Sequence, residues 1–343
     1  MGTYVNPGTE RFKTSRISKF YVDKSMIISL LNDKVESDDR FLCVSRPRRF
    51  GKTMAANMIA AYYSKGCDSH EIFSDLKISK DPTFEDNINR YTVIKLDING
   101  AATGKGDKTI VQYYNENVVP ELMKAYPDVA LSSGMSIAKA LVSIYEETGD
   151  KFVFIIDEYD VIIRDQEYSS EIKGYLTFLV SLFKNSVVSP AIALSYLTGI
   201  MPIIKDKTQS GLNNFTEYTM VDADDMAPFM GFTEEEVQSL AQKSGMAFDE
   251  LKRWYDGYRL KGEKIYSPKS IVDAVEYHEC DGYWTQTSSY EAVTDYISLD
   301  LDGLKDDVVS MLSGNRVEVS TSFYRNTMSF DTKDDVLTYL IHC

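Results

Sequence analysis

The sequence predicts an α/β protein built on a mainly parallel sheet, because apolar runs alternate with helical patterns from about residue 40 to about residue 225. Strands are expected at residues 40–45, 92–98, 151–156 and 191–198, with a short fifth at 216–221. Helical spacing of apolar residues predicts helices at 53–65, 109–125, 136–148 and 170–185. Continuous apolar strands are typical of sheets buried on both faces, so we expect helices on both sides of this one.

The character of the chain changes after residue 225, where a smaller, mostly helical domain is predicted. Thr233 and Glu236 occupy the two positions of a capping box, which indicates a helix start. An aromatic turn is expected at 254–258, and another helix from 266 through 275. We therefore expect three parts, an N-terminal arm at 1–35, a core at 36–225 and a helical lid or C-terminal domain at 226–343.

The C-terminal residues 334–343 form an apolar helical face on which the chain stops. Natural chain ends usually fray in polar residues. We therefore expect the sequence to be a piece of a longer protein, cut before a further domain.

The overall charge limits the partners of this chain. Fifty-two acidic residues against 37 basic ones give a formal net charge of −15, which repels the phosphate backbone of nucleic acids over most of the surface. Broad nucleic-acid binding by this chain is therefore not expected, and nucleic acid would be reached only through a domain that the chain lacks.

Apolar runs and cysteine spacing indicate the compartment. No apolar run approaches the roughly 18 residues that span a bilayer, and the polar N-terminus has no secretory leader, which predicts a cytoplasmic protein without membrane contact. The four cysteines and three histidines show neither CxxC nor HExxH spacing. We expect reduced thiols and no structural zinc.

A phosphate-binding loop is the first functional motif. Gly51-Lys52-Thr53 follows a short apolar strand and opens a helix, which is the context of such loops. Gly51 would allow close approach, Lys52 would contact the β and γ phosphates, and the Thr53 hydroxyl would bind magnesium. The residues expected around the nucleotide are Pro47, Arg48, Arg49, Phe50, Gly51, Lys52, Thr53 and Met54.

The loop departs from the standard G-x-x-x-x-G-K-[ST] pattern. Arg46 stands where the first glycine would be, and Pro47 removes one backbone donor. Phosphate binding is therefore expected to depend less on backbone N–H groups and more on Lys52 and the neighbouring arginines.

The second motif lies about a hundred residues later. Asp157 and Glu158 follow five consecutive apolar residues, so both would lie at the carboxyl edge of the sheet, where doubly wound folds bind ligands. Asp157 would hold magnesium and Glu158 would align the attacking water. The alternative is that the two carboxylates only cap a turn.

Thr198 and four arginines are further candidates for contact with the nucleotide, each with a simpler structural alternative or neighbour in the loop. Thr198 ends the next strand and could contact the γ-phosphate or the water, or could simply finish that strand. Arg48 and Arg49, or Arg253 and Arg259, could stabilise transition-state charge. For Arg253 and Arg259, a solvated surface position is the alternative.

With these residues in hand, the chain resembles the bacterial AAA-ATPase-like family, often found ahead of a PD-(D/E)XK nuclease-like domain. The segments that carry the resemblance are residues 20–25, 45–53, 156–160, 197–200, 210–214, 231–237 and 254–259. It implies ATP as the ligand, and an extra strand between the loop strand and the Asp-Glu strand. It also implies a motif at Tyr21, Asp23 and Lys24, where we expect the base to be contacted. Pro202 departs from the pattern, since an arginine is expected there.

Two functional hypotheses follow. The first is a magnesium-dependent ATPase that acts as a conformational switch or motor for an appended effector domain. The alternative is a nucleotide-binding interaction module with little or no turnover, which Arg46, Pro47 and Pro202 favour. A protein partner or self-association fits either. A DNA-handling role would draw only on a further domain, and no Asp followed by a Glu-x-Lys pair is present in a strand-rich tail to indicate a nuclease.

Overall fold

The computed structural model of the protein describes residues 1–203, 211–283, 300–321 and 332–342. Two compact units are present: the first contains residues 1–44, 52–199 and 211–217, and the second contains 45–51, 200–203 and the described residues from 218 onward. Cys43, Cys67 and Cys280 take part in no disulfide bond among the described residues. Ser210 and Cys343 lie outside the described residues.

The central sheet has five strands in the order β2-β3-β4-β1-β5. Their bounds are β1 Phe41–Ser45, β2 Thr92–Asp97, β3 Phe152–Asp157, β4 Ile192–Gly199 and β5 Thr216–Tyr218. β2 pairs with β3, and β3 with β4, in parallel. β4 therefore lies between the loop strand β1 and the Asp-Glu strand β3, which confirms the extra strand that was expected there.

Burial explains why the strands could be recognised as apolar runs. Every residue of β1, β3 and β4 is buried, as are the first five residues of β2. The exception is β5, which spans three residues instead of the six expected at 216–221. It is an edge strand with an exposed first residue, so its sequence carries less of the apolar pattern.

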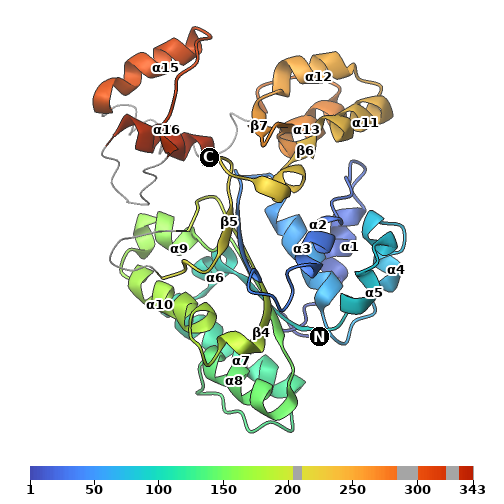
Figure 1. Ribbon diagram of the computed structural model, residues 1–343, viewed down its shortest axis with the longest axis vertical. Coiled ribbons are helices and arrows are strands. Elements are labelled where there is room, and N and C mark those ends of the chain that lie inside the picture. The colour runs from blue at the N-terminus through green and yellow to red at the C-terminus, as the bar shows by residue number, and fades with distance from the viewer. Residues whose placement is uncertain (204–210, 284–299, 322–331, 343) are drawn as a thin grey trace. The chain divides into compact units, whose positions relative to one another are not determined.

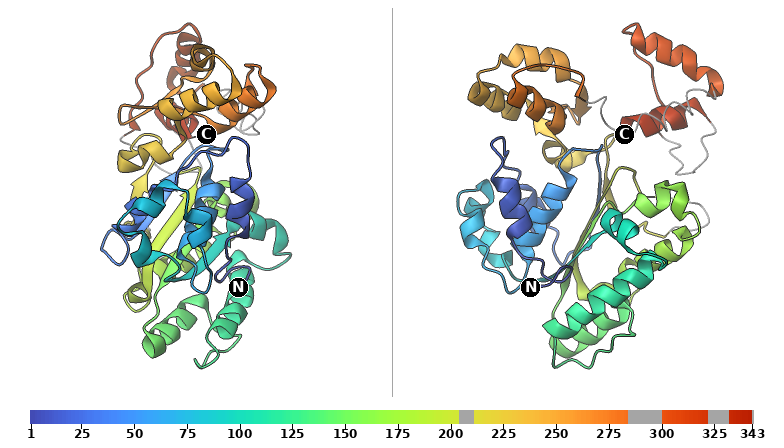
Figure 2. Two further views of the ribbon diagram at one scale, coloured as in Figure 1. Left: turned by 90° about the vertical axis from the view of Figure 1, so that its right-hand side faces the viewer. Right: turned by 180° about the vertical axis from the view of Figure 1, so that it is seen from behind.

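Helices cover both faces of the sheet, as predicted, and Figure 1 shows the two sets on opposite sides. One set contains α1 Glu10–Arg16, α2 Ile27–Asn32, α3 Lys52–Tyr63, α4 His70–Phe73 and α5 Phe84–Asn87. The other set contains α6 Ile98–Gly104, α7 Ile110–Ala125, α8 Ile137–Thr148, α9 Val161–Arg164 and α10 Ile172–Phe183. The same division is visible from behind in Figure 2. The four long helices α3, α7, α8 and α10 confirm the helices predicted at these places.

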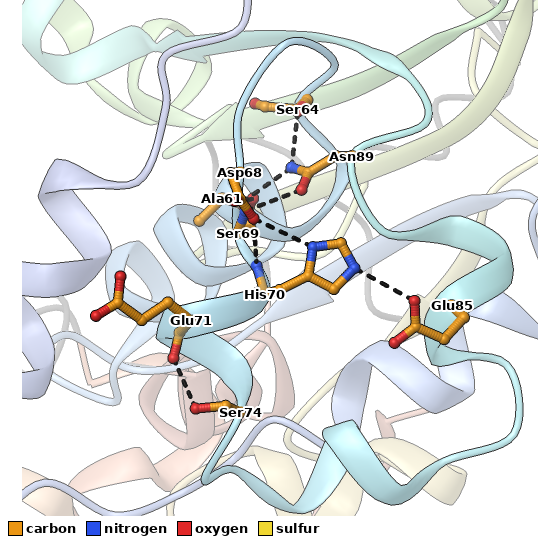
Figure 3. Close-up of polar contacts among 9 residues, drawn as sticks. All are labelled: Ala61, Ser64, Asp68, Ser69, His70, Glu71, Ser74, Glu85 and Asn89. Carbon is orange, nitrogen blue, oxygen red and sulfur yellow. Dashed lines mark hydrogen bonds and ion pairs between the residues drawn. The ribbon is translucent and has the colours of Figure 1, made fainter.

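The connection from α3 to β2 is fixed by a buried polar cluster (Figure 3). Asn89 donates from Nδ2 to the Ser64 carbonyl and to Ser69 Oγ, each at 2.9 Å, and accepts the Ser69 N–H at 2.9 Å. Ser69 Oγ in turn donates to the Ala61 carbonyl at 2.6 Å. The amide of Asn89 thus ties the end of α3 to the start of α4, which holds the return path to β2 in place.

The second unit contains a small antiparallel sheet in the order β6-β8-β7, with helices packed on it. Its elements are β6 Phe232–Thr233, α11 Glu234–Ser244, α12 Phe248–Tyr255, β7 Tyr258–Leu260, β8 Glu263–Tyr266, α13 Pro268–Tyr277, α15 Leu304–Leu312 and α16 Lys333–His342. The Thr233–Glu236 capping box is present, and the helix predicted after Ser267 forms. The smaller, mostly helical domain is therefore confirmed.

One expectation about this unit was wrong. Residues 254–258 do not form a simple turn, because α12 continues to Tyr255 and β7 begins at Tyr258. The turn lies further on, at Lys261-Gly262, where both residues have positive φ and connect β7 to β8. A two-residue loop of this kind matches the twist of an antiparallel hairpin.

Candidate functional site

Asp157 is the last residue of β3 and is only 2% exposed. The Thr198 hydroxyl, from the neighbouring strand β4, donates to Asp157 Oδ1 at 2.6 Å. The pairing of Ile156 with Leu197 brings these next residues side by side. Among the described residues, the Asp157 carboxylate accepts this one hydrogen bond and forms no ion pair. One carboxylate oxygen is therefore available to a ligand.

Glu158 has a strained backbone that Thr198 holds in place. Its φ is +54°, in the left-handed region that non-glycine residues rarely adopt. The Glu158 N–H donates to Thr198 Oγ1 at 3.4 Å, and the Tyr159 N–H donates to the Thr198 carbonyl at 2.9 Å. Thr198 thus contacts three successive residues, and its hydroxyl both donates and accepts. The turn after β3 is fixed from β4.

The electrostatic surroundings of Glu158 raise its pKa above the ordinary value. Burial is the main cause, and the nearby carboxylates of Asp157 and Asp160 act in the same direction. The cations of Lys52 and Arg164 oppose the rise. Lys52, the first residue of α3, is therefore close enough to act on Glu158, and it is itself 6% exposed. The structure brings together Lys52, Asp157, Glu158 and Thr198 in one unit.

Thr53 and Met54 follow Lys52 in the first turn of α3, and both are exposed. The oxygen ligands that suit magnesium are a hydroxyl, such as that of Thr53, and a carboxylate, such as that of Asp157. The residues present therefore fit such an ion. Among the described residues, no group of three or more histidine, cysteine or acidic side chains is arranged to hold a metal.

Residues 45–51, which hold the remaining predicted loop contacts, belong to the second unit. Arg49 and Gly51 have φ of +67° and +80°, so the loop needs two left-handed residues in three positions. Arg49 is exposed and Arg48 half-buried, whereas Pro47 and Phe50 are buried.

Phe50 is the loop's anchor in that unit. Its ring is 4% exposed and meets the Tyr258 ring of β7 edge-on, with centroids 5.4 Å apart. Gly231, just before β6, also approaches closely, since a Cβ there would lie 3.2 Å from the Phe50 ring. The aromatic residue of the loop motif is therefore packed against the small antiparallel sheet.

The motif at Tyr21, Asp23 and Lys24 lies in the first unit, and part of it has a clear structural task. Asp23 accepts the N–H groups of Ser25 and Lys77, both at 2.8 Å. Tyr21 packs on Phe12 of α1, and its hydroxyl is buried without a hydrogen bond among the described residues. The expected contact of Tyr21 with the base stays a prediction.

The two arginine candidates from the C-terminal part of the sequence are exposed in the second unit. Arg253 lies on α12 and Arg259 on β7, and neither side chain forms a hydrogen bond or ion pair within the described part of the chain. Both alternatives for these two residues, solvated surface and transition-state contact, therefore stay open.

Two charged residues near the acidic pair were not predicted from the sequence. Arg164, at the end of α9, forms ion pairs with Asp160 at 3.3 Å and with Glu158 at 4.0 Å. Its spacing of four from Asp160 was a usable signal. Lys95, on β2, is 4% exposed. A single cation inside an apolar strand was the signal for this residue.

The fold and the site define a class. A parallel sheet with a strand between the loop strand and the Asp-Glu strand, and a Gly-Lys-Thr helix start, is the architecture of P-loop NTPases of the additional-strand type. The chain belongs to the AAA-ATPase-like family, since the family model described as a predicted AAA-ATPase matches residues 7–208. Family membership implies nucleotide binding.

Comparison with other proteins gives distant relatives. The chain is 25% identical over 285 residues to the "Uncharacterized protein in vnfD 5'region" of Azotobacter chroococcum mcd 1, covering 81% of this chain and 52% of that protein. It thus spans about half the length of this relative.

Two solved structures show a remote overall similarity to the chain. The E. coli MS115-1 HORMA:CdnC:Trip13 complex contains a chain with 11% identity and a TM-score of 0.37, covering 77% of this chain and 74% of that one. The Aeropyrum pernix ORC2 protein (ADPNP-ADP complexes) has 12% identity and a TM-score of 0.32, covering 91% and 76%. Likenesses at this level carry no functional inference. Separately, none of the helices in the described ranges combines the length and apolar character needed to cross a bilayer.

Proposed function

We propose that the protein hydrolyses ATP with magnesium and uses the cycle as a conformational switch for an effector domain. The observation that carries this proposal is the arrangement around Thr198, which fixes Asp157 and Glu158 side by side at the carboxyl edge of the sheet. A nucleotide-binding module without turnover would not require a strained glutamate held in this way.

The proposed site residues then have the following roles. Lys52 binds the β and γ phosphates, while Asp157 and the Thr53 hydroxyl hold magnesium, which supplies charge neutralisation at the phosphates. Glu158 orients the attacking water or accepts a proton from it. Burial raises the pKa of its carboxylate, which makes that carboxylate a better proton acceptor. Thr198 acts through the acidic pair, because its hydroxyl proton is already given to Asp157. Pro47, Arg48, Arg49, Phe50, Gly51 and Met54 are proposed to surround the nucleotide.

The switch is supported by the packing of Phe50. The loop that receives phosphate carries a buried aromatic ring that contacts Tyr258, so a change in the loop backbone would displace the small sheet and the helices on it. We propose residues 36–225 as the catalytic core, 226–343 as the part that moves, and 1–35 as an arm. The setting is proposed to be cytoplasmic, with a protein partner or self-association receiving the motion.

The second candidate remains nucleotide binding with little or no turnover. Arg46 is 2% exposed and stands where these loops usually have glycine, while Pro47 supplies no N–H. Such a loop offers fewer backbone donors to the transition state. Measured multiple turnover separates the two candidates directly.

The test combines a thermal-shift titration with phosphate release, using ATP, GTP and magnesium. Ligand at a hundredfold excess over the dissociation constant should stabilise the protein by about 2.7 kcal/mol. Lys52→Ala should abolish binding, whereas Glu158→Gln should keep binding and lose turnover; Lys139→Ala, on an exposed position of α8, is the matched control. Phosphate release by Glu158→Gln at the wild-type rate would refute the role given to Glu158, and no shift with any nucleotide would refute both candidates.

A further inference from the structure

Lys95 is a buried cation without a direct partner. It is 4% exposed, and its ammonium forms no hydrogen bond or ion pair within the described part of the chain. Burying an unpaired charge is costly, so such a position calls for a nearby opposite charge or a charged ligand.

The sheet register shows which groups Lys95 shares a face with. β2 and β3 are parallel, with Lys95 opposite Ile155 and Asp97 opposite Asp157. Because side chains alternate along a strand, Lys95 and Asp157 lie on the same face of adjacent strands. Phe154 lies on the other face and packs against Phe183 of α10.

This shared face is the one that α3 covers. Helix α3 contacts β2, β3 and β4. Figure 1 shows α3 and α10 on opposite sides of the sheet. Lys95 and Asp157 are therefore both enclosed beneath the helix that begins with Lys52 and Thr53.

The charged groups that act on Lys95 are few. Burial lowers its pKa, the carboxylates of Asp157 and Asp97 oppose this, and Arg11 of α1 adds to it. Asp97 is exposed and accepts the Gly100 N–H at 3.0 Å as the cap of α6. Asp157 is thus the buried carboxylate that faces Lys95, and it too lacks an ion pair in the described chain.

We infer that Lys95 is the countercharge of Asp157 and thereby sets the affinity of the nucleotide site for its divalent cation. This inference rests on the proposed function. Without the cation, Lys95 offsets the buried negative charge of Asp157 from the adjacent strand on the same face of the sheet. When a cation binds Asp157, the same ammonium repels it, so that the ion is held firmly only when the phosphates of the nucleotide add their own charge.

The test measures cation binding without turnover. Mn²⁺ is titrated into metal-free protein, with and without a non-hydrolysable ATP analogue, and bound Mn²⁺ is measured by electron paramagnetic resonance. Lys95→Met should bind Mn²⁺ about tenfold more tightly than the wild type, and should bind it detectably without nucleotide. Lys95→Arg keeps the charge and should stay near the wild-type affinity. Lys151→Met, which removes a half-buried lysine paired with Glu36, is the control and should change nothing.

A second arm separates this inference from the proposed function. Binding of the analogue is measured in excess chelator for the wild type and for Lys95→Met, and equal affinities are expected. Weaker analogue binding by Lys95→Met would mean that Lys95 contacts phosphate itself, and would overturn the countercharge role. Unchanged or weaker Mn²⁺ binding would do the same. A wild-type protein that binds no analogue in either condition would overturn the proposed function, and the inference with it.

A stability measurement covers the case in which Lys95→Met does not fold well enough for titration. Removing Lys95 alone leaves the Asp157 carboxylate buried without compensation, so Lys95→Met with Asp157→Asn should be more stable than Lys95→Met alone. Chemical unfolding of the two variants in metal-free buffer gives this comparison. A double variant no more stable than Lys95→Met alone would show that the two charges are not coupled.

Discussion

Glu158 and Arg49 both adopt left-handed backbone although neither is glycine, but the molecule holds them in different ways. Around Glu158, Thr198 of the neighbouring strand supplies three hydrogen bonds to successive residues. Arg49 is exposed, its side chain forms no hydrogen bond or ion pair within the described residues, and its neighbour Phe50 is fixed by packing.

The difference indicates two kinds of strain. Where several hydrogen bonds fix a strained backbone, as around Glu158, the strain is a form of preorganisation, because the geometry is set before any ligand binds. Strain next to a single packed ring is adjustable, since the loop can move if that ring moves. We therefore expect changes near Thr198 to affect turnover and changes near Phe50 to affect coupling between the loop and the small antiparallel sheet that Phe50 packs against.

The largest effect is expected from Thr198→Val. This change keeps the shape of the side chain but leaves Asp157 without its donor and the Glu158 N–H without its acceptor. Turnover should fall at least about a hundredfold through misplacement of both carboxylates, with nucleotide affinity nearly unchanged. Phosphate release and analogue binding measure the two quantities. Thr198→Ser keeps the hydroxyl and should retain most activity; equal losses in both variants would show that the hydroxyl is not what matters.

A pair of glycine substitutions sharpens the same contrast. A Cβ at Gly199 would lie 2.7 Å from the buried Tyr159 ring and 2.8 Å from Asp160 Oδ1, whereas a Cβ at Gly51 would meet nothing within 4 Å. Gly199→Ala should therefore cost about 1–3 kcal/mol by overpacking. Gly51→Ala should cost about 1 kcal/mol through its positive φ alone. Chemical denaturation of both variants measures this order, and the reverse order would contradict it.

The sequence was sufficient to predict the central sheet, because β1, β3 and β4 are buried on both faces and thus consist almost wholly of apolar residues. Asp157 and Glu158 could be placed at its edge for the same reason. The role of Thr198 as the residue that holds them depends on which strand is the neighbour of β3, and strand order is a tertiary property.

The β7–β8 hairpin was missed for a different reason. Its strands have three and four residues, and Arg259, Lys264 and Glu263 interrupt any alternation of apolar residues. Lys261-Gly262 is a weaker turn signal than Asn-Gly. The partner of Phe50, Tyr258, therefore could not be recognised before the hairpin was seen.

The coupling role of Phe50 predicts a smaller effect that a double-mutant cycle can isolate. Phe50→Leu and Tyr258→Leu each keep an apolar side chain but lose the edge-on ring contact. Their coupling energy should be about 1 kcal/mol in thermal or chemical unfolding. If the ring pair transmits the loop's state, the coupling energy should change when the ATP analogue is bound. A coupling that is the same with and without analogue would leave the rings as packing only.

The smallest effect is expected at His70, which lies outside both regions. It serves as a reference for the effect of losing an exposed ionic contact. Its ring contacts Asp68 and Glu85 at 3.2 Å each, and these bonds, Asp68 first, raise the pKa of His70 (Figure 3). A raised folded-state pKa means that the stabilisation is complete below the unfolded value of about 6.5 and is lost as pH rises through the folded value. His70→Gln should therefore reduce stability at pH 6 by less than about 1 kcal/mol, since both ion pairs are exposed, and by still less at pH 8. Unfolding curves at the two pH values check the sign, and a larger loss at pH 8 would contradict it. Turnover per folded molecule should not change, because the substitution removes only two surface ion pairs and touches neither Thr198 nor Phe50.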